Sequence, residues 1–161
     1  AVLEALKKIK KKEKFYFIHQ TGTQDFAQVR NSYANLGIMA RVDSFFDNMA
    51  SLYQQADLII CRSGATTVAE ITAVGKGVIF IPYPFATDDH QSINAGALEH
   101  AGAAEMILQK DLTGAILSDR IEHYASNRVA LHQMASRAKA FGRPRAAASI
   151  VDDCYRLVVN Q

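Results

Sequence analysis

The feature that most constrains the fold is a regular alternation of short apolar runs with longer stretches of helical period. Runs rich in β-branched and aromatic residues predict strands at FYFIH (15–19), IMARV (38–42), DLIIC (57–61), VIFIP (78–82) and AAEMI (103–107). The stretches between them predict helices at 1–11, 24–36, 47–55, 66–74 and 91–101, then a helical tail from 113 with breaks near 127 and 142–144. We therefore expect a doubly wound α/β domain with a Rossmann-like parallel sheet covered on both faces.

Local signals place the ends of several elements. Thr23 or Gln24 is expected to open the second helix, Asp47 to cap the third, and Gly75 and Gly77 to end the fourth. Because the pattern begins on a helix, we expect the first strand of the fold and its turn to be missing. With no internal repeat and no low-complexity linker, the 161 residues are expected to form one domain.

Composition excludes several classes of protein. The net charge of +2 gives no global field for nucleic acid, and no run approaches the roughly 18 apolar residues of a membrane span. Cys61 and Cys154 form no disulfide framework, which favours a reducing, cytoplasmic compartment. The one basic cluster, KKIKKKEK at 7–14, has two interpretations: the solvated end of a helix, or a patch facing anionic lipid or a partner.

The segment CRSGATTVAE (61–70) follows directly on a predicted strand and begins a helical pattern. Gly64 and Ala65 carry no bulky side chain, so a ligand can approach the backbone, and we expect the free amides of residues 65–68 to face outward. Together with the positive end of the helix dipole, such a turn is a natural phosphate site.

The side chains of this turn have two interpretations. Glu70 lies at i+4 from Thr66 and i+3 from Thr67, so it shares their face and is placed to accept hydrogen bonds from a ribose diol. Residues 67–70 equally fit a capping box, in which Glu70 only reaches back to the cap amide. Spacing alone leaves both open. The G-x-x-x-x-G-K-[ST] pattern is absent, so this is not a Walker loop.

A long polar loop, PYPFATDDHQSINA (82–95), follows the fourth predicted strand. Its two aspartates and His90 lack a second histidine at ligand spacing, and acidic residues before a helix are ordinary capping groups, so no metal is predicted. Gln91 and Asn94 lie three residues apart and face one way, which suits hydrogen bonding to sugar hydroxyls.

A third loop, DSFFDNM (43–49), carries adjacent aromatic residues. Phe45 and Phe46 favour inward packing as part of the core, and the stacking of a flat base there is the functional alternative. His19, at the end of the first predicted strand, either borders the same crevice or is a structural turn residue.

These segments together resemble the MurG family of bacterial glycosyltransferases. The resemblance rests on HQTG at 19–22, FFDNM at 45–49, CRSGATTVAE at 61–70, and DDHQSINA at 88–95 followed by AGAA at 101–104. Members of this family transfer N-acetylglucosamine from UDP-N-acetylglucosamine to lipid I, giving lipid II in peptidoglycan synthesis. The resemblance implies the C-terminal, donor-binding domain of an enzyme of the GT-B type. The family's GGSQGA turn and its N-terminal, acceptor-binding domain would precede residue 1.

The resemblance also implies site residues, position by position. The threonine region and the amides would hold the diphosphate, and Glu70 the ribose hydroxyls. Phe46 matches the position whose backbone reads the uracil edge, and Gln91 a glutamine that contacts sugar hydroxyls. The implied donor-binding residues are Phe46, Ala65, Thr66, Thr67, Val68, Ala69, Glu70 and Gln91, with Gly64 and Asn94 as further contacts.

Family membership implies an inverting transfer in which the lipid I hydroxyl displaces UDP without a metal or cofactor. The general base is expected on the missing half, and no catalytic residue is assigned here because His90 has no visible partner. The implied partners are UDP-N-acetylglucosamine, lipid I through the missing domain, and a membrane surface for the full-length enzyme. The implied location is peripheral, on the cytoplasmic face of the inner membrane, with this portion itself soluble.

Two alternatives remain open at this point. The chain can be a separate donor-binding subunit of a two-chain transferase, although such a subunit should retain its first strand and glycine-rich turn. It can also be another UDP-sugar enzyme, such as an epimerase, although these loops show no clear carboxylate or histidine pair for acid–base chemistry.

Overall fold

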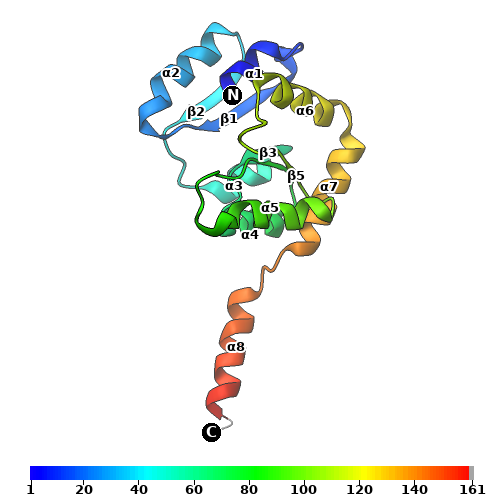
Figure 1. Cartoon of the computed structure of the whole chain (residues 1–161). Helices are drawn as coiled ribbons and strands as arrows, with labels where there is room; N and C mark the ends of the chain where they lie inside the picture. Colours follow the sequence, from blue (N-terminus) through cyan, green and yellow to red (C-terminus); the bar gives the residue numbers. More distant parts are fainter. Residues whose placement is uncertain (160–161) are drawn as a thin grey trace.

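The computed structural model describes residues 1–159, in which helices and strands alternate along the chain (Figure 1). The strands are β1 Tyr16–Gln20, β2 Met39–Asp43, β3 Leu58–Cys61, β4 Gly77–Phe80 and β5 Glu105–Met106. The helices are α1 Val2–Lys8, α2 Gly22–Asn35, α3 Met49–Gln55, α4 Ala65–Val74, α5 His90–His100, α6 Gly114–Ser126, α7 Arg128–Phe141 and α8 Ala146–Val159. Two 3₁₀ turns, η1 Lys12–Lys14 and η2 Thr87–Asp89, precede β1 and α5.

The predicted order of elements is confirmed, and the differences lie at helix starts. α2 begins at Gly22, ahead of the expected opening by Thr23 or Gln24. The prediction that Asp47 caps α3 is wrong, because Asn48 is the N-cap and its Oδ1 accepts a hydrogen bond from the Ser51 amide at 3.1 Å. Gly75 ends α4 in the left-handed region with φ of 72°, as expected of a glycine C-cap. Gly77, also expected at this helix end, is instead the first residue of β4.

Every strand pair is parallel, as predicted, but the strands of the described residues form two sheets instead of one. β1 pairs with β2 from Tyr16 opposite Met39 onward, while β4 lies between β3 and β5. The sheet is interrupted between β1 and β3. Within residues 1–159, no strand lies between the facing edges of these two strands.

A cleft of about 990 Å³ separates the facing edges of β1 and β3. It is lined on the strand sides mainly by apolar residues, and α6 contributes Ile121 and Tyr124. Residues from the two strands and the segment before β1 that line it include Phe15, Tyr16, Phe17, Ile18, Leu58 and Ile60. In the doubly wound strand order 3-2-1-4-5-6, the position between β1 and β3 is that of the first strand, with β1 and β3 in the places of the second and fourth.

Strand β4 is the centre of the larger sheet, with all four of its residues buried. Because side chains alternate along a strand, Val78 and Phe80 pack with Ile71 of α4 and Leu98 of α5 on one face. Ile79 points to the other face and packs in a second cluster with residues of α6 and α7. Burial on both faces explains why VIFIP is a continuous apolar run.

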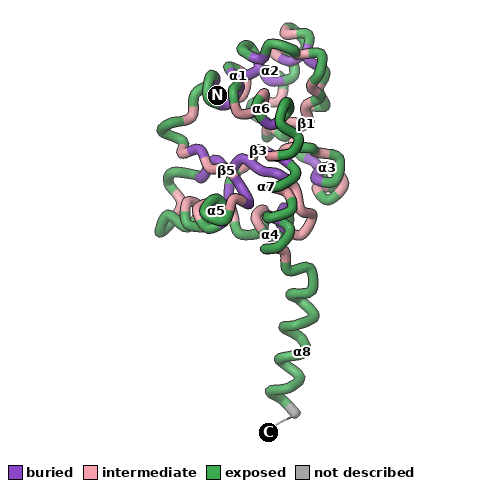
Figure 2. Tube along the Cα trace, turned by 90° about the vertical axis from the view of Figure 1, so that its right-hand side faces the viewer, coloured by how far each residue is buried: buried purple, intermediate pink, exposed green. Residues whose placement is uncertain are grey.

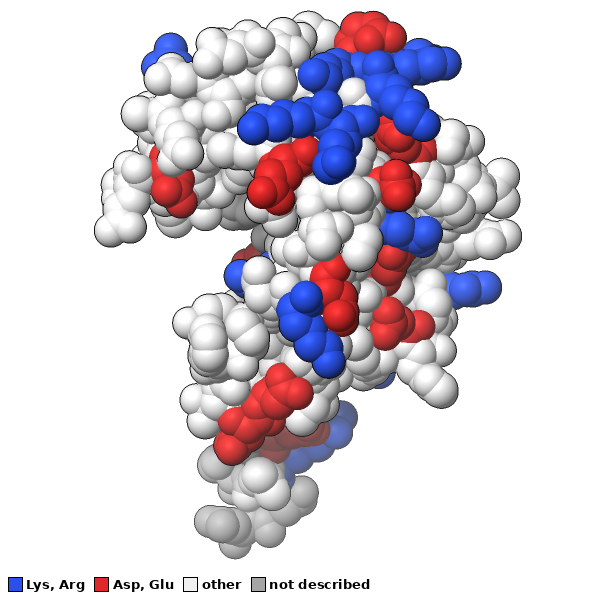
Figure 3. Space-filling view, turned by 45° about the horizontal axis from the view of Figure 1, so that its top comes forward, with Lys and Arg blue, Asp and Glu red and all other residues white. Residues whose placement is uncertain are grey.

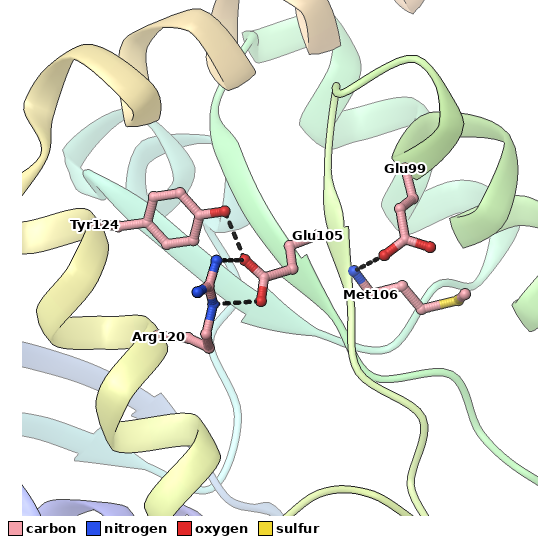
Figure 4. A network of polar contacts seen from close by, with 5 residues as sticks. All are labelled: Glu99, Glu105, Met106, Arg120 and Tyr124. Carbon is pink, nitrogen blue, oxygen red and sulfur yellow. Dashed lines mark hydrogen bonds and ion pairs between the residues drawn. The ribbon is translucent and has the colours of Figure 1, made fainter.

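The short strand β5 is fixed by polar contacts to two helices (Figure 4). Glu105 accepts hydrogen bonds from Arg120 Nη2 at 2.7 Å and from the Tyr124 hydroxyl at 2.6 Å, both on α6. On the other side, the Met106 amide donates to Glu99 of α5 at 2.9 Å. These bonds hold the two-residue strand in register beside β4.

The basic run at 7–14 lies on the surface, where Figure 3 shows Lys and Arg side chains gathered over the segment around α1 and β1. Five of its six lysines are exposed, and Lys12 is half-buried. Within residues 1–159, no ion pair involves any of these lysines. The arrangement fits either interpretation of the run.

Helix α8 extends away from the rest of the molecule (Figure 1 and Figure 2). Its described side chains, residues 146–158, are all exposed, including Ile150 and Leu157. No helix within residues 1–159 combines the length and the hydropathy needed to cross a membrane.

The contact between α1 and α6 is too close for a side chain at Gly114. A Cβ there would lie 2.8 Å from the Glu4 carbonyl carbon and 3.0 Å from the Ala5 nitrogen, whereas a Cβ on Gly96 of α5 would meet nothing within 4 Å. We expect Gly114→Ala to lower the free energy of unfolding by about 1–3 kcal/mol through overpacking. The matched change Gly96→Ala should raise it by about 0.5–1 kcal/mol. Urea denaturation followed by circular dichroism measures both, and equal effects would contradict the packing account.

Candidate functional site

The polar loops singled out in the sequence follow the carboxyl ends of β2, β3 and β4, before α3, α4 and α5. Parallel strands bring these ends to one edge, and α4 contacts both α3 and α5. The three loops therefore meet at one side of the molecule, where ligands bind in open α/β sheets.

The turn between β3 and α4 presents unpaired amides. Gly64 is the N-cap with an extended backbone and no side-chain cap, and a Cβ there would meet nothing within 4 Å. The Val68 amide makes the first bond of the helix, to the Gly64 carbonyl at 2.9 Å. The free amides are therefore those of residues 65–67, and the expectation that Val68 contributes one is wrong. Val68 instead packs its half-buried side chain against the core.

The capping-box interpretation of this turn is wrong. Thr67 is the third residue of α4 and not its cap, because the helix begins at Ala65 after Gly64. The Glu70 carboxylate is exposed and accepts a hydrogen bond from the Tyr53 hydroxyl of α3 at 3.3 Å. Thr66 is exposed and Thr67 half-buried, so Glu70 shares a partly open face with both threonines.

A buried serine joins this turn to α5. Ser63 has no exposed surface, and its hydroxyl donates to the Gln91 carbonyl at 2.8 Å. Asn94 Nδ2 donates to the Ser63 carbonyl at 3.1 Å, and Gln91 Oε1 accepts from the Tyr83 amide at 3.0 Å. The structure thus brings Gln91 and Asn94 to the β3–α4 turn. The linking role of Ser63 was missed, although a hydroxyl residue directly before a helix-capping glycine could have indicated it.

Arg62 was also missed by the sequence reasoning. Its Nη1 donates to the carbonyls of Ile81 at 3.0 Å and Pro82 at 2.9 Å, and its guanidinium lies 5.6 Å from the centre of the Tyr83 ring. These contacts tie the loop after β4 to the loop after β3. The two loops therefore form one connected polar framework.

The two phenylalanines before α3 lie in different environments. Phe46 is 5% exposed, and the Arg41 guanidinium lies 4.9 Å from its ring centre, so inward packing is correct for this side chain. Phe45 is 66% exposed. The Phe46 amide donates to Gln20 Oε1 at 2.9 Å, which fixes the loop to the end of β1. A role for Phe46 in binding a base therefore rests on its backbone.

Neither histidine of interest has a carboxylate partner within residues 1–159. His19 Nδ1 lies 3.2 Å from the Tyr33 hydroxyl, and burial lowers the pKa of its imidazole. His90 Nδ1 lies 2.7 Å from the Thr87 carbonyl of its own turn. In the same described range, no group of three or more His, Cys, Asp or Glu residues is placed to hold a metal ion.

Comparisons with known proteins converge on one class of enzyme. The sequence model of one protein family, the glycosyltransferase family 28 C-terminal domain, matches residues 1–150. The chain is 46% identical over 149 residues to a Myxococcus xanthus protein named UDP-N-acetylglucosamine--N-acetylmuramyl-(pentapeptide) pyrophosphoryl-undecaprenol N-acetylglucosamine transferase. That match covers 92% of this chain and 39% of the relative.

Solved structures give the same result for the fold. The crystal structure of Acinetobacter baumannii MurG is similar with a TM-score of 0.83 and 36% identity, over 93% of this chain and 43% of that one. The glycosyltransferase VinC, solved in complex with dTDP, matches with a TM-score of 0.68 at 17% identity, over 99% of this chain and 37% of that one. The second match supports the fold alone. This chain spans about two fifths of the length of the relatives it matches.

We expect Ser63→Ala to lower the free energy of unfolding by about 1–2 kcal/mol, because it removes a buried hydrogen bond between two loops. Ser32→Ala is a matched control: its hydroxyl bonds locally to the Gln28 carbonyl of the same helix, and the effect should stay within about 0.5 kcal/mol. Thermal denaturation distinguishes the two. Similar losses in both variants would argue against a joining role for Ser63.

The lowered pKa of His19 predicts a pH dependence of stability. Its folded-state pKa lies below the ordinary value of 6.5, so the unfolded chain binds the proton more readily and stability is lost as pH falls through that range. We expect the stability of His19→Gln to fall less than that of wild type between about pH 7.5 and 5. Urea midpoints across this interval measure the difference, and parallel curves would contradict it.

Proposed function

Because this chain belongs to the glycosyltransferase family 28 C-terminal domain family, we propose that it binds UDP-N-acetylglucosamine as the donor half of an N-acetylglucosaminyltransferase. In the complete enzyme, the sugar is transferred to lipid I with inversion, and lipid II is the product. The observation that carries the proposal is the turn of residues 64–67, with three free helix amides beside the exposed carboxylate of Glu70.

The start of α4 suits a diphosphate. Helix amides that lack intrahelical partners, aligned with the positive end of the dipole, bind phosphate oxygens. Those of Ala65, Thr66 and Thr67 meet this description, and the open space at Gly64 allows close approach. The same groups stabilise the charge that develops on departing UDP, because fixed donors need no reorganisation during the reaction.

The remaining parts of the donor fit the surrounding residues. Glu70 accepts hydrogen bonds from the ribose hydroxyls, as an exposed carboxylate one turn from the phosphate amides can. Gln91 and Asn94, held at the turn through Ser63, lie where the sugar follows the diphosphate. The Phe46 backbone meets the base, with Phe45 exposed beside it. Val68 and Ala69 contribute the helix surface between these contacts.

The acceptor is assigned to sequence outside this chain. The name of the Myxococcus relative specifies an undecaprenol-linked acceptor, and the chain spans only 39% of that protein. We infer that lipid I, the general base and contact with the membrane surface at the cytoplasmic face belong to the rest of the enzyme. Such an acceptor, anchored by its lipid, makes a peripheral membrane location the natural one.

Residues 1–161 form one domain in this proposal, and preceding sequence supplies a strand to its sheet. The cleft between β1 and β3 is flanked by two strand edges that lack neighbours there among residues 1–159 and is lined mostly by apolar side chains. A parallel strand at this position satisfies both edges, and α1 then forms the crossover from it to β1.

Extending the chain by about 15 residues of its natural preceding sequence, enough for a turn and a strand of five or six, should stabilise the domain. We expect a higher midpoint of thermal unfolding and less self-association than in the 161-residue chain, because open strand edges are aggregation sites. An extension of scrambled sequence is the control. Equal behaviour of the natural and scrambled extensions would rule out strand insertion.

The donor site is tested by calorimetric titration of UDP-N-acetylglucosamine, UDP-glucose and ADP. We expect the first ligand to bind most tightly, and Glu70→Ala to weaken it by more than about 1 kcal/mol through loss of charge-assisted hydrogen bonds. The matched control is Glu13→Ala, which removes an exposed carboxylate in η1, far from α4 in sequence. A folded protein that binds none of the three ligands, or equal effects of both variants, would reject this site.

A further inference from the structure

A buried tyrosine of α3 supports the exposed carboxylate of α4. Tyr53 is 9% exposed, and its hydroxyl donates to Glu70 Oε2 at 3.3 Å. Within residues 1–159, this is the hydrogen bond that holds the Glu70 side chain, and it joins positions 17 residues apart. The ring packs in the main core with Ile59 and Ile71, so core packing fixes the position of the hydroxyl.

The Tyr53 hydroxyl stays protonated and so remains a hydrogen-bond donor to Glu70. Burial, reinforced by the Glu70 charge, raises the pKa of the Tyr53 hydroxyl to about 12. The phenol therefore keeps its proton at neutral pH and donates to the carboxylate. A carboxylate has about four acceptor positions, so one bond to Tyr53 leaves Oε1 and part of Oε2 open to solvent.

Anchoring changes what Glu70 can do. A free glutamate side chain loses rotamer freedom when it binds a ligand, and this loss opposes binding. A glutamate already held at one oxygen has lost part of this freedom before the ligand arrives. Two neighbouring hydroxyls of a ribose require a carboxylate in one orientation, so they gain more from the anchor than a single hydroxyl does.

The anchor also connects two parts of the proposed site. Helix α3 follows the loop of Phe45 and Phe46, and Asn48 caps its first turn. Tyr53, one turn further along α3, reaches across to Glu70 on α4. The position of the loop that meets the base and the orientation of the carboxylate that meets the ribose are therefore linked through a single helix.

We propose that Tyr53 is a positioning residue that orients Glu70 toward both hydroxyls of the nucleotide ribose and thereby sets a preference for ribonucleotides over deoxyribonucleotides. The proposal rests on the donor site described above. Tyr53 does not touch the ligand. It acts through Glu70, and its removal should weaken selectivity for the ribose without abolishing diphosphate binding.

The test is calorimetric titration of UDP and 2′-deoxy-UDP into wild type, Tyr53→Phe, Glu70→Ala and the double variant. We expect wild type to prefer UDP roughly tenfold, the scale of one hydrogen bond to a charged group. Tyr53→Phe should raise the Kd for UDP roughly three- to tenfold and change that for 2′-deoxy-UDP less than about twofold. In the double variant, loss of Tyr53 should add nothing to the loss of Glu70.

Tyr33→Phe is the matched control. Tyr33 is another buried tyrosine, and its hydroxyl meets His19 instead of a site residue. This variant removes a buried hydroxyl of the same kind and should leave the ratio of the two Kd values unchanged. Placing 4-aminophenylalanine at position 53 restores a donor at the same point of the ring and should recover the preference for UDP.

The outcomes separate this inference from the proposed function. If Glu70→Ala leaves UDP binding unchanged, the ribose role of Glu70 fails and the role of Tyr53 fails with it. If Glu70→Ala weakens UDP but Tyr53→Phe does not, only the positioning role is overturned. Equal weakening of both ligands in Tyr53→Phe identifies a merely structural tyrosine and also overturns it. Recovery of the preference by the amino analogue supports the proposal even if Tyr53→Phe folds poorly.

Discussion

Parallel pairing of β3 with β4 is the constraint on which the candidate site depends. The register from Leu58 opposite Gly77 to Cys61 opposite Phe80 makes both strands end at the same edge. The turn into α4 and the loop before α5 therefore lie side by side, although they are about 20 residues apart in sequence. Burial of β4 on both faces makes this pairing rigid, because neither face can shift without exposing apolar surface.

Polar contacts convert this proximity into a defined shape. Ser63 is bonded to α5 at both its hydroxyl and its carbonyl, and Arg62 holds the carbonyls at the end of β4. Buried polar groups of this kind are costly unless they are satisfied, so their full pairing favours one arrangement of the two loops. Free hydrogen-bonding capacity remains at the amides of residues 65–67 and on the Glu70 carboxylate, the groups that the proposed function assigns to the nucleotide donor.

Sequence reasoning worked where the signal is local. Short apolar runs located each strand of the described residues. Gly75 was identified as a helix end because the left-handed conformation there favours glycine. It failed where two local patterns compete. Thr67 and Glu70 have capping-box spacing, but the helix begins two residues before Thr67, at Ala65, so Thr67 is not the cap and Glu70 bonds to Tyr53 instead. Asp47 and Asn48 are both good caps, and only the path of the loop selects Asn48.

The sequence by itself determined the α/β order, the parallel direction of the strands and the motif residues that gather at their carboxyl ends, because these follow from periodicity and connection rules. Only the tertiary structure decided that Phe46 is buried, that Val68 has no free amide, and that Tyr53 holds Glu70. It alone also decided that the sheet is divided between β1 and β3. These facts depend on contacts between residues far apart in the chain, and no local pattern encodes which distant partner a side chain will meet.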